Sequence, residues 1–275
     1  MRFPADTMVT GARLARISQS AIYAPLTDTG EVARRATQQL VEKIKTANKE
    51  IFGEAPTTEA VWRSMRHRDV TRKVRDFLWK HVHGIYKLGS FWNHVPGYED
   101  RAECPLCNKP DTFDHIVTEC GSTEKETVRE QANGLWRRKY DEDLPLSVGA
   151  VLGGGIANFR GRSGKPDTAR NRLYRILITE SAHLIWVLRC ERKITNGDNP
   201  GNYHSAEAVI NRWYTEINER MQIDCLMTSI HLYERKALKT KVVYDTWTKC
   251  STNTEDLRRH PGVLILVGMT PGRNR

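Results

Sequence analysis

The stretch that organises this sequence is CPLCNKPDTFDHIVTEC, which runs from residue 104 to residue 120. It places Cys104, Cys107, His115 and Cys120 in the pattern C-x2-C-x7-H-x4-C. Two cysteines three residues apart can turn both thiolates into one concavity, and Pro105 stiffens that turn. Three thiolates and an imidazole form a closed tetrahedral set for Zn²⁺, with no position left for water. The spacing therefore predicts one structural zinc ion per chain.

The residues around the histidine favour a short helix. Asp111 or Thr112 is expected to cap it, and Gly121 is expected to follow its end. The alternative is that the four side chains are ordinary reduced thiols and a surface histidine. The chain has 275 residues and six cysteines, and no apolar stretch follows Met1. Reduced thiols and metal ligands therefore fit this sequence better than a disulfide framework does.

Helical periodicity surrounds the cysteine cluster. Residues 29–52 carry an apolar stripe at intervals of three and four, with Asp28 or Thr29 as the expected N-cap, and residues 70–85 carry a second stripe. Residues 168–195 are apolar on nearly every side, which predicts a buried helix. We expect a further helix to begin at Ser205. The predicted fold is mainly α, with helical segments around a small zinc-stapled module and a second, hairpin-like helical tail.

Composition shifts suggest how the chain is divided. The glycines between residues 144 and 167, including a run of three at 153–155, predict a flexible linker. The predicted divisions are an N-terminal helical segment (1–57), a zinc-binding domain (58–143), a Gly-rich basic linker (144–167), a helical tail (168–240) and an irregular C-terminus (241–275) with one short strand at 263–267.

The charge balance points to a polyanionic partner. The 43 Lys and Arg residues outnumber the 33 Asp and Glu residues, which gives a formal net charge of +10. The longest apolar run is residues 263–267, far below the roughly 20 residues that a bilayer requires, so we expect no membrane partner and an intracellular protein, cytoplasmic or nuclear. The candidate phosphate-binding residues are Arg66, Arg68, Arg72, Lys73, Arg75 and Lys80. A second basic set is Arg160, Arg162, Lys165, Arg170, Arg172 and Arg175. The alternative is that each set is a solvated helix face.

The motifs around the cysteine cluster resemble a known family. They are VWRS at 61–64, RKVRDFLWK at 72–80 and HG at 83–84, followed by the cysteine cluster with Asp114 before its histidine. Together they resemble the zinc-binding domain and C-terminal tail of LINE-type (non-LTR) retrotransposon reverse transcriptases, of the type found in fungi. The resemblance covers about 10–240 and is densest at 61–120. Many family members have Glu where this chain has Asp114, a mild departure.

The resemblance implies that Cys104, Cys107, His115 and Cys120 are the metal ligands, and that the chain handles RNA or DNA. The catalytic parts of such proteins are missing from the sequence: it has no Tyr-x-Asp-Asp motif, no set of spaced acidic residues for two-metal hydrolysis, and no phosphate-binding loop after the glycine run. We therefore expect a non-catalytic fragment without a small-molecule substrate. The alternatives are a zinc-stabilised protein-interaction scaffold and a decayed relic without selected function.

Overall fold

A computed structural model describes residues 35–252 and Leu266. This part of the chain is mainly helical and contains no sheet, as the periodicity predicted. The α-helices are α2 (Arg35–Phe52), α3 (Thr58–Ser64), α4 (Arg72–Val82), α5 (Thr123–Tyr140), α6 (Val148–Leu152), α7 (Thr168–Cys190), α8 (Ala206–Leu226), α9 (Ile230–Tyr233) and α10 (Thr240–Trp247). Short 3-10 turns are η3 (Gly89–His94), η4 (Glu99–Ala102), η6 (Gly154–Ile156), η8 (Pro200–Asn202) and η9 (Glu234–Lys236), and the π-helical turns are η5 (His115–Glu119) and η7 (Glu191–Thr195).

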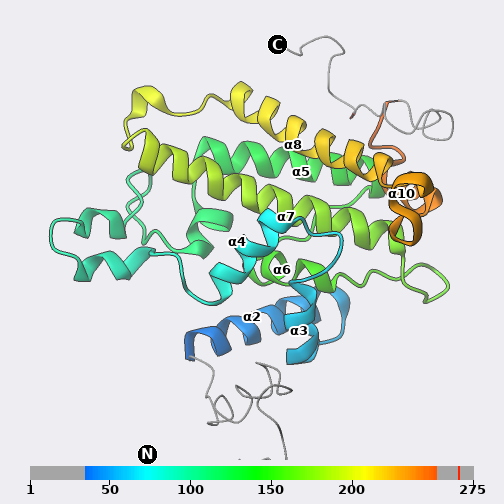
Figure 1. The fold of residues 1–275 in the computed structure, drawn as a ribbon. Coiled ribbons are helices and arrows are strands. Elements are labelled where there is room, and N and C mark those ends of the chain that lie inside the picture. Colours follow the sequence, from blue (N-terminus) through cyan, green and yellow to red (C-terminus); the bar gives the residue numbers. More distant parts are fainter. Residues whose placement is uncertain (1–34, 253–265, 267–275) are drawn as a thin grey trace, which may run out of the picture.

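Helix α7 is the centre of the core. Its apolar residues cover nearly every side, and it packs against α4, α5, α6, α8 and α10. Figure 1 shows α5, α7 and α8 running alongside one another, with α2, α3 and α6 below them. Asp167 caps α7 by accepting a hydrogen bond from the Arg170 N–H at 2.9 Å. The predicted burial of this segment is confirmed, and so is the Ser205 cap of α8, which accepts from the Ala208 N–H.

The glycine-rich stretch is not a flexible linker between residues 148 and 157. Residues 148–152 form α6, which is buried against α2. A Cβ atom at Gly149 would lie 2.5 Å from the Lys43 carbonyl oxygen, and one at Gly155 would overlap the Ser64 carbonyl. These glycines therefore allow α6 and the following turn to approach α2 and α3 closely. Only the turn around Gly161 and Gly164 is exposed, as a linker would be.

The prediction of an irregular C-terminus over residues 241–275 is also wrong for its first residues. Residues Thr240–Trp247 form α10, because Val243 and Trp247 have side chains that the core buries completely. The proposed N-caps at Asp28 and Thr29 and most of the strand at 263–267 lie outside the described residues. Leu266 itself makes an isolated bridge with Ser251. None of the helices described has both the length and the apolar character needed to cross a bilayer.

A buried network of charges lies beside α7. The Arg172 guanidinium donates two hydrogen bonds of 2.6 Å to Asp224 of α8 and one of 3.1 Å to Asp69. Arg175 donates to the other oxygen of Asp69 at 3.0 Å, and the Trp247 indole donates to Asp224 at 2.9 Å. Burial alone would raise the pKa of Asp69, but Arg172 and Arg175 outweigh it and hold that pKa below its usual value.

The second predicted basic set is therefore not a phosphate-binding surface as a whole. Arg172 is only 2% exposed and its charge is used inside the protein, as is that of Arg175. Arg170 pairs with Glu142 and lies over the Phe159 ring. The exposed members are Arg160, Arg162 and Lys165.

Candidate metal centre and basic groove

The four predicted metal ligands come together in space. One donor atom from each of Cys104, Cys107, His115 and Cys120 lies within 4.8 Å of the other three. The Cys104 and Cys120 sulfurs are 3.8 Å apart, and the Cys107 sulfur is 3.0 Å from His115 Nε2. Cys104, His115 and Cys120 are buried, and Cys107 is half-buried. The cluster could hold a metal ion.

The first two cysteines are presented by a tight turn. The Cys104 carbonyl accepts hydrogen bonds from the Cys107 and Asn108 N–H groups, at 3.3 and 2.8 Å. The Cys104 N–H donates to the Lys109 carbonyl at 2.8 Å, and an isolated bridge joins Glu103 to Pro110. Asn108 closes the turn in the left-handed region at a φ of 53°, which asparagine tolerates better than most residues. Both thiols consequently face the same side of the loop.

The other two ligands come from a π-helical turn. Thr112 accepts a hydrogen bond from the His115 N–H at 3.2 Å, which confirms one of the two predicted caps. The Cys120 N–H donates to the His115 carbonyl at 2.7 Å, five residues back. This wider turn brings both side chains to one side of η5, and such single π turns are frequent at functional sites.

The histidine is oriented for one ring nitrogen to meet a metal. Nε2 faces the cysteines, whereas Nδ1 is buried and has no hydrogen-bond partner within the described part of the chain. The Glu119 carboxylate lies 4.0 Å from Nδ1. Metal-binding histidines commonly direct their second ring nitrogen to a carboxylate in this way.

Two of the thiols share a proton strongly. The pKa of Cys104 is lowered to about 4, chiefly because the Cys120 thiol donates a hydrogen bond to it, and His115 adds to the effect. The pKa of Cys120 is raised, because its proton is held by Cys104 and the thiol is buried. The first thiolate is thus available at neutral pH, and a bound cation would take the place of the shared proton.

The cluster is tied to α7 by ion pairs. Asp111, which is 1% exposed, pairs with Arg189 and lies 3.4 Å from the Lys193 ammonium. Asp111 therefore does not cap the turn that carries His115, so the first of the two predicted caps is wrong. Its carboxylate instead joins the loop before η5 to the end of α7.

A basic groove lies between α3 and α4, the helices that precede the metal loop. Its volume is about 730 Å³. Three of the six predicted phosphate-binding residues line it, namely Arg66, Arg72 and Arg75. The rest of its lining is Glu59, Trp62, Arg63, Met65, Asp76, Trp79 and His83.

The other three predicted residues lie elsewhere. Lys73 pairs with Glu216 of α8, and Lys80 pairs with Asp76 at 2.6 Å. Arg68 is exposed in the turn before α4 but is not part of the groove lining. The sequence reasoning did not assign Trp62 and His83 to this surface. The signal for His83 is its four-residue spacing from Trp79, which places the two side chains on one side of α4 at its C-terminal end. Arg66 lies in the turn after α3, so no helical spacing links it to Trp62.

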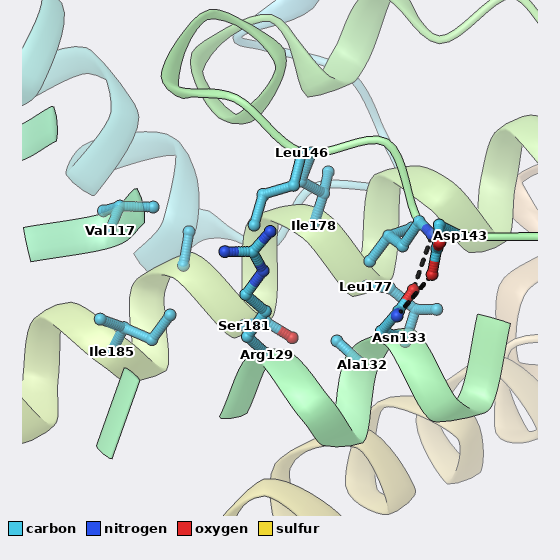
Figure 2. A pocket seen from close by; sticks show the side chains of 12 residues that line it. Val117, Arg129, Ala132, Asn133, Asp143, Leu146, Leu177, Ile178, Ser181 and Ile185 are labelled. Carbon is cyan, nitrogen blue, oxygen red and sulfur yellow. Dashed lines mark hydrogen bonds between the residues drawn. The ribbon is translucent and has the colours of Figure 1, made fainter. Parts of the chain in front are cut away.

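A second hollow, of about 280 Å³, lies between α5 and α7 (Figure 2). Ala132, Ile178 and Ile185 are among the apolar side chains that line it, and Arg129 reaches across it. The Asp143 carboxylate at its edge accepts hydrogen bonds from Asn133 at 2.8 Å and from Arg137 at 2.7 Å. Its one carboxylate is therefore already engaged, and this hollow presents no pair of groups for acid–base chemistry.

Comparison of the chain with models of known protein families, with curated proteins and with solved structures finds no match. Any function must consequently be argued from the residues themselves.

Proposed function

We propose that the cysteine–histidine cluster holds a structural Zn²⁺ ion. A tetrahedral zinc site with Zn–S bonds of about 2.3 Å has S···S edges of about 3.8 Å, and the Cys104 and Cys120 sulfurs are 3.8 Å apart. Cys107 and His115 would move apart by about half an ångström, and donor pairs that now lie as far as 4.8 Å apart would draw together, to complete such a tetrahedron. With three thiolates and one imidazole, no coordination position remains for water or substrate, so the ion would stabilise the fold rather than catalyse a reaction.

The observation that carries this proposal is the poor core of the segment around the cluster. Between residues 83 and 114, the buried residues are Gly89, Ala102, Cys104 and Asp111, and none of them is a large apolar side chain. Tyr86, Leu88 and Phe113 pack against the core from its two ends and are only partly buried, so apolar burial contributes little to the order of the residues between them. Zinc binding contributes on the order of 10 kcal/mol to the folding of small modules of this kind.

Metal content tests the zinc proposal directly. Purified wild-type protein should carry one zinc per chain by elemental mass spectrometry, and Cys107→Ser should carry none. Cys190→Ser is the matched control, because Cys190 is also half-buried but lies outside the cluster. Its zinc content should equal that of the wild type. A wild-type chain that is folded and free of metal would refute the proposal.

We further propose that the chain binds nucleic acid through the α3–α4 groove, as the resemblance to retrotransposon reverse transcriptases suggests. Arg66 and Arg72 are exposed and form no ion pair or side-chain hydrogen bond with any described residue. Arg75 is held in place because its Nε donates to the Val70 carbonyl at 2.8 Å. The first turn of α4 contains no acidic residue and Thr71 does not cap it, so the helix dipole adds to this positive potential.

Salt dependence and charge reversal test the nucleic-acid proposal. Binding of a labelled oligonucleotide should weaken steeply with salt, and Arg66→Glu with Arg72→Glu should abolish most of it while leaving the unfolding curve unchanged. Arg138→Glu on the exposed side of α5 is the control and should bind nearly as the wild type does. If the double variant binds the oligonucleotide as tightly as the wild type does, the α3–α4 groove is not the nucleic-acid site.

The second candidate is a protein-interaction scaffold, which the exposed Ile223 and Leu226 of α8 and Ile230 and Leu232 of α9 favour. Contacts through apolar side chains survive 0.5 M NaCl, whereas phosphate contacts do not. Neither candidate requires catalysis, and we propose that the chain is not an enzyme. Hydrolysis of an RNA–DNA hybrid by the pure protein in Mg²⁺ or Mn²⁺ would contradict that statement.

A further inference from the structure

Trp79 is an unusual residue to find on a charged surface. It stands on α4 with 45% of its area exposed, although α4 buries its other large apolar side chains, Phe77 and Leu78, almost completely. Single exposed hydrophobic side chains are common on protein surfaces, so the exposure of Trp79 matters here because of the rings and charges that surround it.

Trp79 belongs to a cluster of three rings. His83, one helical turn further along α4, lies 4.4 Å from the Trp79 ring, measured between centroids. On α3, Trp62 stacks on the same histidine at 5.5 Å, with an angle of 21° between the ring planes. The three rings therefore contact one another across the two helices, and these contacts preorganise the Trp79 side chain for ligand binding.

Positive charge surrounds this ring cluster. The groove lining contains four arginines, at positions 63, 66, 72 and 75, against the two carboxylates of Glu59 and Asp76. Both carboxylates already have cationic partners, since Glu59 pairs with Arg63 at 2.5 Å and Asp76 with Lys80 at 2.6 Å. Arg66 and Arg72 have no ionic partner within residues 35–252, and both line the same groove as the exposed indole of Trp79.

We propose that this groove binds single-stranded nucleic acid, with an unpaired base against Trp79 and backbone phosphates on Arg66 and Arg72. This inference rests on the nucleic-acid function proposed above and adds the form of the ligand. Aromatic platforms next to cations are the recurrent means of holding single strands, because every base has a face that can stack. In a duplex those faces are already stacked on neighbouring bases, so Trp79 could not use them.

The test uses the full chain with its metal and two fluorescein-labelled probes, a 12-nucleotide oligo(dT) strand and a random-sequence 12-base-pair duplex, in fluorescence anisotropy titrations. The wild type should bind the single strand more tightly than the duplex. Trp79→Ala should weaken single-strand binding about tenfold and leave duplex binding unchanged. Trp79→Phe should recover most of the lost affinity, because phenylalanine also presents a ring face.

Two further variants separate stacking from charge. Tyr98→Ala is the matched aromatic control, because Tyr98 is 46% exposed and lies outside the groove. It should leave both affinities unchanged. Arg72→Ala should weaken the single strand and the duplex alike, and should reduce the slope of log affinity against log salt by about one.

The outcomes distinguish this inference from the function on which it rests. If Trp79→Ala binds the single strand as the wild type does while Arg72→Ala does not, the base platform is refuted and phosphate binding stands. Equal wild-type affinity for strand and duplex refutes the single-strand preference. If neither probe binds but poly-glutamate does, the groove is a site for acidic proteins, and both proposals fall.

Discussion

Asp224 is fully buried on α8 and joins three helices through its carboxylate. It accepts from Arg172 of α7 and Trp247 of α10, and the Arg220 Nε lies 3.4 Å away. Because a cation left alone in the core is far more costly than a matched pair, the energetic importance of this residue is seen when one partner is removed.

We expect Asp224→Asn to lower the free energy of unfolding by about 3 kcal/mol, because Arg172 would keep only the Asp69 carboxylate, which it shares with Arg175. The measurement is urea denaturation of the zinc-loaded chain, followed by circular dichroism. Asp143→Asn is the control, since Asp143 pairs with Arg137 in solvent and should change the unfolding midpoint very little. A shift of equal size in the two variants would contradict this view of the network.

His81 should make the fold sensitive to acid. Burial lowers its pKa from 6.5 to about 3, although the Phe77 carbonyl at 3.3 Å partly opposes the shift. The unfolded chain therefore binds this proton near pH 6.5 while the folded chain stays neutral, so stability falls as the pH falls from about 6.5 toward 3.

His81→Leu should reduce that slope between pH 6.5 and 4, by up to about 1.4 kcal/mol per pH unit. The side chain packs among Phe77, Phe113 and Trp186, so leucine suits its surroundings. Unfolding free energies of both proteins at matched pH values test this, with excess zinc present so that acid loss of metal affects both equally. Parallel curves would show that His81 is not the group responsible.

Individual residues differed in how well the sequence predicted them. The four candidate metal ligands could be found because seventeen consecutive residues contain them all. Arg172 and Arg175 were assigned to a basic surface, because nothing near them in the sequence reveals that Asp69, over 100 residues away, is their partner. A local sequence pattern shows that a segment is charged, but it does not show which side chains those charges contact after folding.

At the scale of elements, α6 crosses α2 closely because the chain lacks side chains at the contact. We expect Gly149→Ala to destabilise the protein by about 1–3 kcal/mol, since its methyl group would meet the Lys43 carbonyl and the Ala47 side chain. Gly134→Ala on the exposed side of α5 is the matched control. Nothing lies within 4 Å of its added methyl group, so it should stabilise the helix by about 0.5–1 kcal/mol. Thermal unfolding of the two variants would show opposite shifts.

The sequence predicted some elements better than others for a related reason. Helix α7 followed from a long segment that is apolar on nearly every side, and α8 followed from its periodicity and its Ser205 cap, which are signals within a few positions. Glycine is compatible with both a mobile loop and a close crossing of two helices. Residues 148–157 form the close crossing because of their contact with α2, which is distant in the sequence. The same holds for α10, whose burial depends on helices far away in the sequence.

At the scale of the molecule, we expect the helical core to stay folded when the cysteine–histidine loop holds no metal ion. We expect a chelator to raise amide hydrogen exchange across residues 85–122 while α7 and α8 remain protected. The reason is that most of the buried large apolar side chains lie in the α-helices, and the segment 85–122 contributes only Ile116 and Val117 to the fully buried core. Loss of protection in α7 at the same chelator concentration would show that the ion holds the whole fold together.

The groove could not be predicted from the sequence in the same way. The basic run at 66–80 was visible in the sequence, yet three of its six members lie outside the groove, and the aromatic cluster requires Trp62 of α3 to meet His83 at the end of α4. The sequence shows only that the segment is charged. Which of its arginines line the α3–α4 groove is determined by the fold.

The central position of α7 also has a consequence for synthesis of the chain on the ribosome. Helix α2 packs against α6 and α3 against η6, whereas α4 packs against α7, so the apolar face of α4 stays partly uncovered until about residue 190 has emerged. The cysteine–histidine loop closes on contacts at most 16 residues apart, and loops that short form quickly. If the loop binds a metal ion as proposed, a nascent chain would bind it before its core is complete and before Arg189 and Lys193 pair with Asp111.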